Sequence, residues 1–113
     1  MKRTLLTSLT VLWATSAFAH SPLEATVPAN EATLTEVPSE IVLDFKGNIR
    51  LTRVAMTHAA HEADLDLGGV SGFISDYTIP MQSMGAGTYQ IEWRGLGDDG
   101  HPMNGTFSFT VEE

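Results

Sequence analysis

Cysteine is absent from the 113 residues of this chain. Disulfides therefore cannot hold its fold together, and thiolate metal sites and thiol redox chemistry are both excluded. The fold must rest on core packing alone, which a domain of roughly 100 residues can supply. The length is enough for one domain and too short for two.

Basic side chains are also few, with 6 Lys and Arg against 14 Asp and Glu. A surface this acidic repels nucleic acid and anionic membranes, and it attracts cations. We therefore expect no nucleic-acid partner. Solubility alone would also account for the acidity, so charge by itself does not point to a function.

Long apolar runs are missing outside the N-terminus. There, Lys2 and Arg3 precede an apolar run from 5 to 13, and Ala17-Phe18-Ala19 follows it. The run is too short to span a bilayer as a helix, and the small-x-small motif is typical of signal peptidase sites. An uncleaved membrane anchor is the alternative. We predict a signal peptide over 1–19 and an exported domain over 20–113, without membrane insertion and with a formal charge of −10.

The rest of the chain alternates apolar and polar residues with period two, and no segment carries a convincing helical stripe. Turn residues such as Lys46-Gly47-Asn48 separate the alternating runs. This pattern predicts an all-β sandwich or small barrel of about seven strands. The segment His58–Leu67 is ambiguous and fits either a loop or a single helical turn. The expected strands lie at 23–27, 41–45, 49–56, 73–79, 89–94 and 106–111.

Cleavage after Ala19 would make His20 the new N-terminus. A terminal histidine offers its α-amine and a nitrogen of its own ring, which together close a chelate ring on one metal ion. Cu(II) binds nitrogen donors most tightly among the divalent first-row ions and accepts a tetragonal arrangement. A histidine that follows the signal by chance is the alternative, and this feature alone does not decide between them.

A second candidate is Asp99-Gly100-His101-Pro102. In an extended segment, residues two apart point to the same face, which would aim a carboxylate and an imidazole at one point. An ordinary polar turn is the alternative for this motif taken alone. His20, Asp99 and His101 together would supply one amine, two imidazoles and one carboxylate. That set suits Cu(II) better than Zn(II) or Ca(II).

These residues carry a family resemblance. The start His20-Ser21-Pro22-Leu23, the run 87–94, the Asp99–Pro102 motif and the run 105–109 resemble the CopC copper-resistance family. The resemblance implies a periplasmic, Greek-key, immunoglobulin-like β-sandwich that binds Cu(II). It implies His20, Asp99 and His101 as ligands and a CopD-like inner-membrane copper transporter as partner. The sequence shows no Ser/His/Asp set, no evident pair of catalytic carboxylates and no phosphate loop, so we do not expect an enzyme. We expect a monomer. The family often has a serine where this chain has Gly97.

Several other residues have candidate roles. Asp98 and Glu24 could be outer partners of the metal ligands. Met81 and Met84 could hold Cu(I) through their thioethers, although core filling is the ordinary role of such residues. His58 and His61 could bind metal on a helical turn, but we favour a solvated loop. These roles are left open by the residues alone.

Two other functions compete with a copper carrier. A copper-dependent oxidase could use His20 and a second histidine, because this arrangement resembles the histidine brace of lytic polysaccharide monooxygenases. A carboxylate ligand argues against it, since a hard anionic oxygen stabilises the oxidised ion. An adhesion or structural sandwich without metal is the third reading.

Overall fold

The computed structural model describes residues 22–69 and 72–112. In this part of the chain every regular element is a strand, and no helix long and apolar enough to cross a membrane is found among these residues. The strands are β1 (Leu23–Val27), β2 (Ala32–Leu34), β3 (Glu40–His58), β4 (His61–Asp64), β5 (Ile74–Pro80), β6 (Gly87–Gly97) and β7 (Pro102–Val111).

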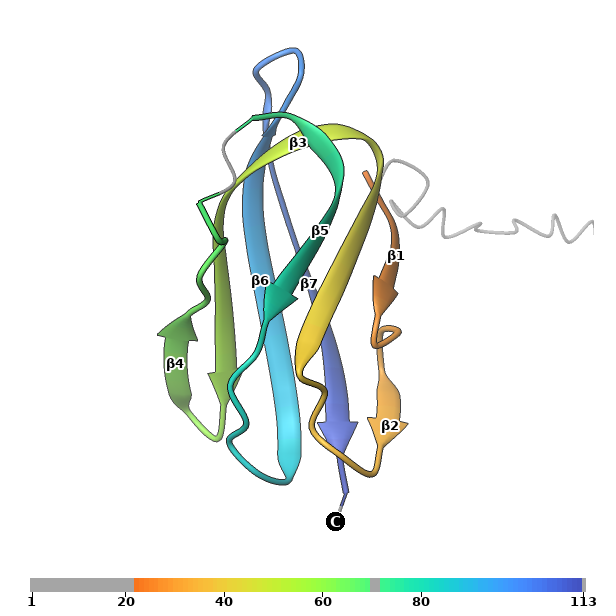
Figure 1. Cartoon of the computed structure of the whole chain (residues 1–113), viewed down its shortest axis with the longest axis vertical. Coiled ribbons are helices and arrows are strands. Elements are labelled where there is room, and N and C mark those ends of the chain that lie inside the picture. Colours follow the sequence, from red (N-terminus) through yellow and green to blue (C-terminus); the bar gives the residue numbers. More distant parts are fainter. Residues whose placement is uncertain (1–21, 70–71, 113) are drawn as a thin grey trace, which may run out of the picture.

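One long strand, β3, builds both layers of the fold. Its first part pairs with β1 on one side and with β5 on the other, and its second part pairs with β6 and β4. Figure 1 shows β3 bending over at one end of the molecule between these two parts. The sheet runs in the order β1-β3-β6-β7-β2 and so curls into the expected β-sandwich.

The predicted turn at Lys46-Gly47-Asn48 is therefore wrong. These three residues are exposed and lie within β3, where the strand passes from one layer to the other. The ladder to β5 is irregular between Asp44 and Ile49, which marks the bend. A Cβ added at Gly47 would meet no atom within 4 Å, so the bend is open on this side. Turn-forming residues here bend a strand without ending it, because both of its halves find pairing partners.

The core lies between the layers and follows the predicted alternation. Every second residue is buried in β3 from Ile41 to Phe45, in β6 from Tyr89 to Gly97 and in β7 from Phe107 to Val111. Trp93 packs edge-on against Phe45, with 5.0 Å between ring centroids, and Tyr89 stacks on Phe109 at 5.2 Å. Burying each such side chain contributes about 1.5–3 kcal/mol, which is how the fold forms without disulfides. The largest fully buried side chains are those of Trp93, Tyr89, Phe45, Phe109, Ile41, Leu43, Met56, Ile79, Ile91, Val54 and Val111.

The predictions for two segments need correction. His58–Asp64 is neither a loop nor a helical turn, because β3 continues to His58 and β4 returns antiparallel from His61. Ala59 and Ala60 form the tight turn, with φ of 50° and 68°. Further on, Phe73 is 44% exposed and precedes β5, so the strand predicted over 73–79 begins one residue later, at Ile74.

Candidate metal centre

Asp99 and His101 lie at the tip of the β6–β7 hairpin, which projects at one end of the sandwich (Figure 1). The loop between the strands is closed by two backbone bonds. The Gly100 N–H donates to the Gly97 carbonyl at 2.9 Å, and the Gly97 N–H donates to the His101 carbonyl at 2.9 Å. Gly100 has φ of +86°, which a residue with a Cβ rarely adopts. The Asp-Asp-Gly sequence therefore folds as a three-residue hairpin loop.

The Asp99 carboxylate and the His101 ring are in direct contact. Oδ2 of Asp99 lies 2.8 Å from Nδ1 of His101, and Oδ1 accepts a 3.1 Å bond from the His101 backbone N–H. The prediction that the two side chains meet is confirmed, but the reason given for it is wrong. They meet because the chain turns at Gly100, whereas the sequence argument assumed an extended segment.

The hydrogen bonds lower the pKa of the Asp99 carboxyl below its ordinary value of 3.8. The larger cause is the His101 backbone N–H, followed by the His101 ring. A lowered pKa means that the folded turn favours the carboxylate. The stability that the carboxylate thereby adds to the folded protein is present above the ordinary pKa, and it is lost as pH falls through the lowered pKa. The side chains of His101 and Asp99 are 75% and 60% exposed, so they remain accessible to an ion from solvent.

This pair can act on a metal ion in two ways. With Nδ1 turned to the carboxylate, Nε2 is the ring nitrogen available to a metal, and Asp99 then orients the ring. Alternatively, the ion replaces the shared proton and binds the carboxylate and Nδ1 together. In residues 22–69 and 72–112, no three His, Asp or Glu side chains gather at one point. The described part of the site therefore supplies two protein ligands.

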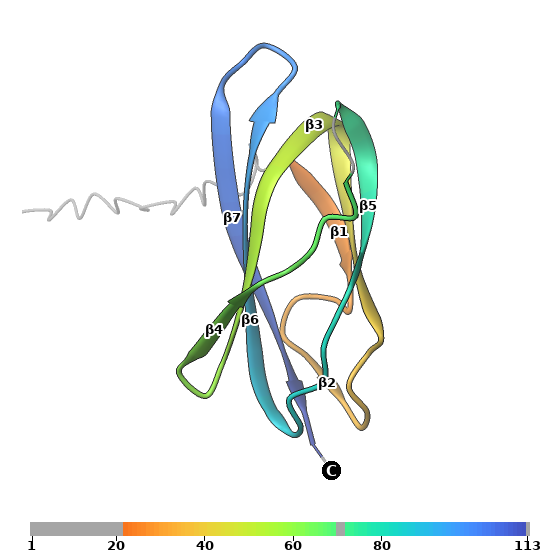
Figure 2. The same ribbon diagram turned by 60° about the vertical axis from the view of Figure 1, so that its left-hand side comes forward.

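The first predicted ligand, His20, lies outside the described residues. Strand β1 begins at Leu23, three residues further on, at the same end of the sandwich as the β6–β7 loop (Figures 1 and 2).

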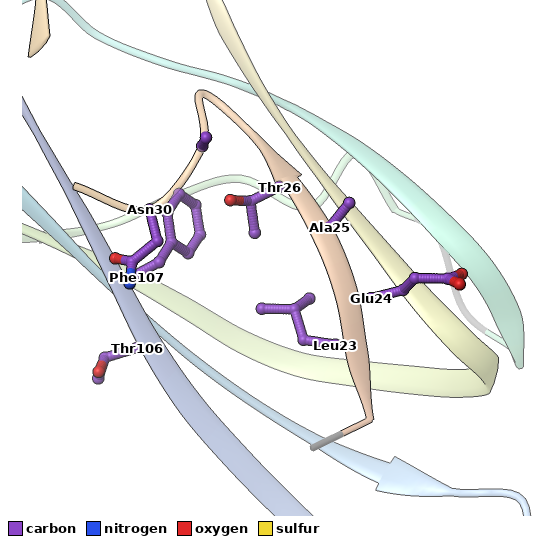
Figure 3. A pocket seen from close by; sticks show the side chains of 8 residues that line it. Leu23, Glu24, Ala25, Thr26, Asn30, Thr106 and Phe107 are labelled. Carbon is purple, nitrogen blue, oxygen red and sulfur yellow. The ribbon is translucent and has the colours of Figure 1, made fainter. Parts of the chain in front are cut away.

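The two predicted outer partners are less well supported. Asp98 is an exposed residue of the loop, and Glu24 is exposed on β1. In the described part of the chain, no hydrogen bond joins either of them to Asp99 or His101. Glu24 borders a pocket of about 380 Å³ between β1 and β7, and Figure 3 shows its side chain directed away from Leu23 and Phe107. Their role as outer partners stays a prediction.

Comparison with known proteins gives the family. The sequence model of the CopC domain matches residues 23–112. The chain belongs to the CopC family. Its relatives include Copper resistance protein C of Escherichia coli, 29% identical over 86% of this chain and 85% of the relative. Copper resistance protein C of Pseudomonas syringae pv. tomato is 31% identical over 83% of this chain and 82% of the relative.

Solved CopC structures share the fold. CopC from Methylosinus trichosporium OB3b superposes with a TM-score of 0.68 at 22% identity, covering 82% of this chain and 94% of that one. PcoC, a methionine-rich copper resistance protein from Escherichia coli, gives 0.58 at 27% identity, covering 82% and 99%. The expected resemblance and fold are confirmed. The family is one of copper resistance proteins and not of enzymes, which agrees with the prediction that this chain is not an enzyme.

The methionines proposed for Cu(I) lie far from the Asp99–His101 pair within this CopC domain. Met81 and Met84 follow β5, at the opposite end of the sandwich from the β6–β7 loop (Figure 1). Both are partly buried and pack against the core. The Met84 N–H also donates to the Tyr89 hydroxyl at 2.9 Å. These contacts fit core filling, and a Cu(I) site at this end stays a prediction.

His58 and His61 face each other across the β3–β4 hairpin. His58 Nε2 lies 2.8 Å from the Ala86 carbonyl oxygen, and its ring packs on Tyr89 with 4.5 Å between centroids. One carboxylate near His61 is engaged elsewhere, because Asp64 Oδ1 pairs with Arg53 Nη2 at 2.9 Å. The helical arrangement that would have aimed both rings at one ion does not form, so these contacts favour a structural role for His58.

Met103, to which the sequence pattern assigned no role, also lies at this site. A Cβ at Gly97 would lie 2.8 Å from Met103 Cε and 3.1 Å from Asp99 Oδ1, so the thioether packs next to the carboxylate. The signal was present in the sequence, because Asp99, His101 and Met103 follow one another at intervals of two.

Proposed function

We propose that this protein is an exported Cu(II)-binding protein that holds one ion between its processed N-terminus and the β6–β7 loop. The observation that carries the proposal is the Asp99–His101 contact at 2.8 Å, on an exposed loop at the end of the sandwich where β1 begins. Membership of a family of copper resistance proteins supports copper as the cargo.

The donor set follows from the chemistry of the chain. Removal of residues 1–19 would give His20 a free α-amine beside its imidazole, which supplies two nitrogens to one ion. His101 adds a third nitrogen, and Asp99 adds an oxygen. Such mixed nitrogen and oxygen sets suit the tetragonal preference of Cu(II). Because the loop already holds Asp99 against His101, little ordering is needed when the ion arrives.

Export places the protein in the periplasm, where it buffers copper or passes it on. We expect the recipient to be a CopD-like transporter of the inner membrane. An exposed ion at the tip of a hairpin suits transfer, because a recipient can reach it without opening the core. The strongly acidic surface favours cation capture and a positively charged docking face on the partner.

The test is a Cu(II) titration of protein purified from the periplasm, in competition with a chelator of known affinity. A mass spectrum first establishes whether the chain begins at His20. We expect sub-micromolar binding of one ion and an electron paramagnetic resonance spectrum with nitrogen couplings. His101→Ala should weaken binding by about 100-fold or more, since even outer partners of ligands contribute 10–100-fold.

His61→Ala is the matched control, because it removes an exposed histidine outside the proposed site. It should leave the affinity unchanged. A variant with one extra residue before His20 should bind as weakly as His101→Ala, since the amine is then moved away from its ring. Equal affinity of the extended and processed forms would refute the chelate, and the reverse ranking of the two histidine variants would relocate the site.

A further inference from the structure

The hairpin that carries Asp99 and His101 presents a third side chain able to bind copper. Met103 lies two residues beyond His101, as the second residue of β7. Its side chain is partly buried and packs against the core, so it lies on the inner face of the hairpin. A carboxylate, an imidazole and a thioether therefore follow one another within five residues.

Gly97 provides the space that the thioether occupies. A Cβ at Gly97 would meet Met103 Cε at 2.8 Å and Sδ at 3.7 Å, and it would meet Asp99 Oδ1 at 3.1 Å. The sulfur and the carboxylate oxygen thus border the same small space on the opposite strand. The distance between Met103 Sδ and Asp99 Oδ1 therefore cannot exceed the sum of their distances from that Cβ, which are 3.7 Å and 3.1 Å. Any side chain at Gly97 would intrude between them.

Met103 is not sealed in the core, unlike Met56, which is 1% exposed. It borders an open pocket of about 380 Å³ beside the hairpin, together with Gly95 and Pro102. Methionine has three rotatable side-chain bonds, so its sulfur can move several ångströms without a backbone change. The thioether can therefore reach an ion held by the neighbouring imidazole.

We propose that Met103 is a Cu(I) ligand of the same centre, an inference that rests on the copper function proposed above. Soft thioether sulfur favours Cu(I), hard carboxylate oxygen favours Cu(II), and imidazole accepts both. His101 is then the shared ligand. Asp99 completes its coordination of the oxidised ion, and Met103 replaces Asp99 when the ion is Cu(I). One loop would hold copper in either oxidation state, with no need for a second centre at the Met81–Met84 end.

The experiment uses processed protein from the periplasm and Cu(I) alone as the probe, without oxygen and in competition with a chromophoric Cu(I) chelator. Met103→Leu removes the sulfur and nearly conserves the volume. Met84→Leu is the matched control at the opposite end of the sandwich. We expect Cu(I) affinity to fall roughly tenfold or more in Met103→Leu, about 1.4 kcal/mol or more, and to stay unchanged in Met84→Leu.

X-ray absorption of the Cu(I)-loaded proteins gives a second measurement. A sulfur neighbour of copper should be present in the wild type and in Met84→Leu, and absent in Met103→Leu. Cu(II) affinity should be equal in all three. If Met103→Leu unfolds, Gly97→Ser serves instead, because it displaces the thioether from its place and should likewise lower Cu(I) affinity.

Two results would overturn the inference. One is an unchanged Cu(I) affinity in Met103→Leu, and the other is loss of the sulfur neighbour in Met84→Leu alone. Either result alongside normal Cu(II) binding would leave the proposed function standing. Failure of the wild type to bind Cu(II) would refute the proposed function and, with it, this inference.

Discussion

The close approach of Gly105 to Trp93 makes Gly105→Ala a sharp test of the packing within the β6–β7 hairpin. An added Cβ would lie 2.8 Å from Trp93 Nε1 and 2.9 Å from both Cε2 and Cζ2. The indole cannot move aside easily, since it is 1% exposed and its ring centroid lies 5.0 Å from that of Phe45. The indole N–H also has no hydrogen-bond partner in the described structure, so its environment is set by packing alone.

The magnitude follows from two opposing effects. Overpacking a core costs about 1–3 kcal/mol, whereas alanine in place of glycine restricts the unfolded chain and returns about 0.4–1 kcal/mol. We expect Gly105→Ala to lower the free energy of unfolding by about 1–2 kcal/mol. For a domain of this size that corresponds to a fall in Tm of roughly 5–15 °C.

Chemical denaturation followed by tryptophan fluorescence is the suitable assay, because Trp93 is the one tryptophan within 20–113 and reports on its own packing. Gly47→Ala is the control, since a Cβ there would meet nothing within 4 Å. Its stability should be unchanged or slightly higher. Equal stability of the two variants, with unaltered emission, would refute the packing argument.

Three further predictions concern the site and one strained turn. The carboxyl of Asp99 should titrate below 3.8 in a ¹³C NMR experiment, and His101→Ala should return it only part of the way, because the backbone N–H is the larger cause; complete return would assign the shift to the ring. Copper(II) should dissociate as pH falls through about 5–6, when imidazole protonates, and retention at pH 3 in the titration would contradict these ligands. Ala60→Gly should raise the free energy of unfolding by about 1 kcal/mol, because the left-handed conformation disfavours a Cβ; an unchanged thermal melt would show that the turn is not strained.

Much of the fold could be predicted from the sequence because burial on one face imposes period-two alternation. Tyr89, Ile91 and Trp93 alternate with polar residues, and all three are buried in β6. Strand β1 also has its predicted bounds, although its pattern is less regular. The prediction failed at 46–48, where turn-forming residues lie inside β3, since a local pattern does not reveal that one strand serves two layers.

The candidate metal centre, too, could be predicted from the sequence only in part. The residue types of Asp99 and His101, with glycine between them, already indicated a carboxylate beside an imidazole. Their contact, however, depends on a loop that is closed by backbone hydrogen bonds at Gly97. The prediction had assumed an extended segment instead. The proximity of Met103 to Asp99 depends on the pairing of β6 with β7 and on the missing side chain at Gly97.

By itself, then, the sequence determined which faces are apolar, which residues are candidate copper ligands and which family the chain resembles. These properties are local, because they depend on residue type and on spacing of a few positions. Only the tertiary structure decided that β3 spans both layers, that Met81 and Met84 lie at the opposite end from the β6–β7 loop, and that Met103 packs beside Asp99. Those facts depend on strand pairing between distant segments, and short-range patterns do not encode which strands will pair.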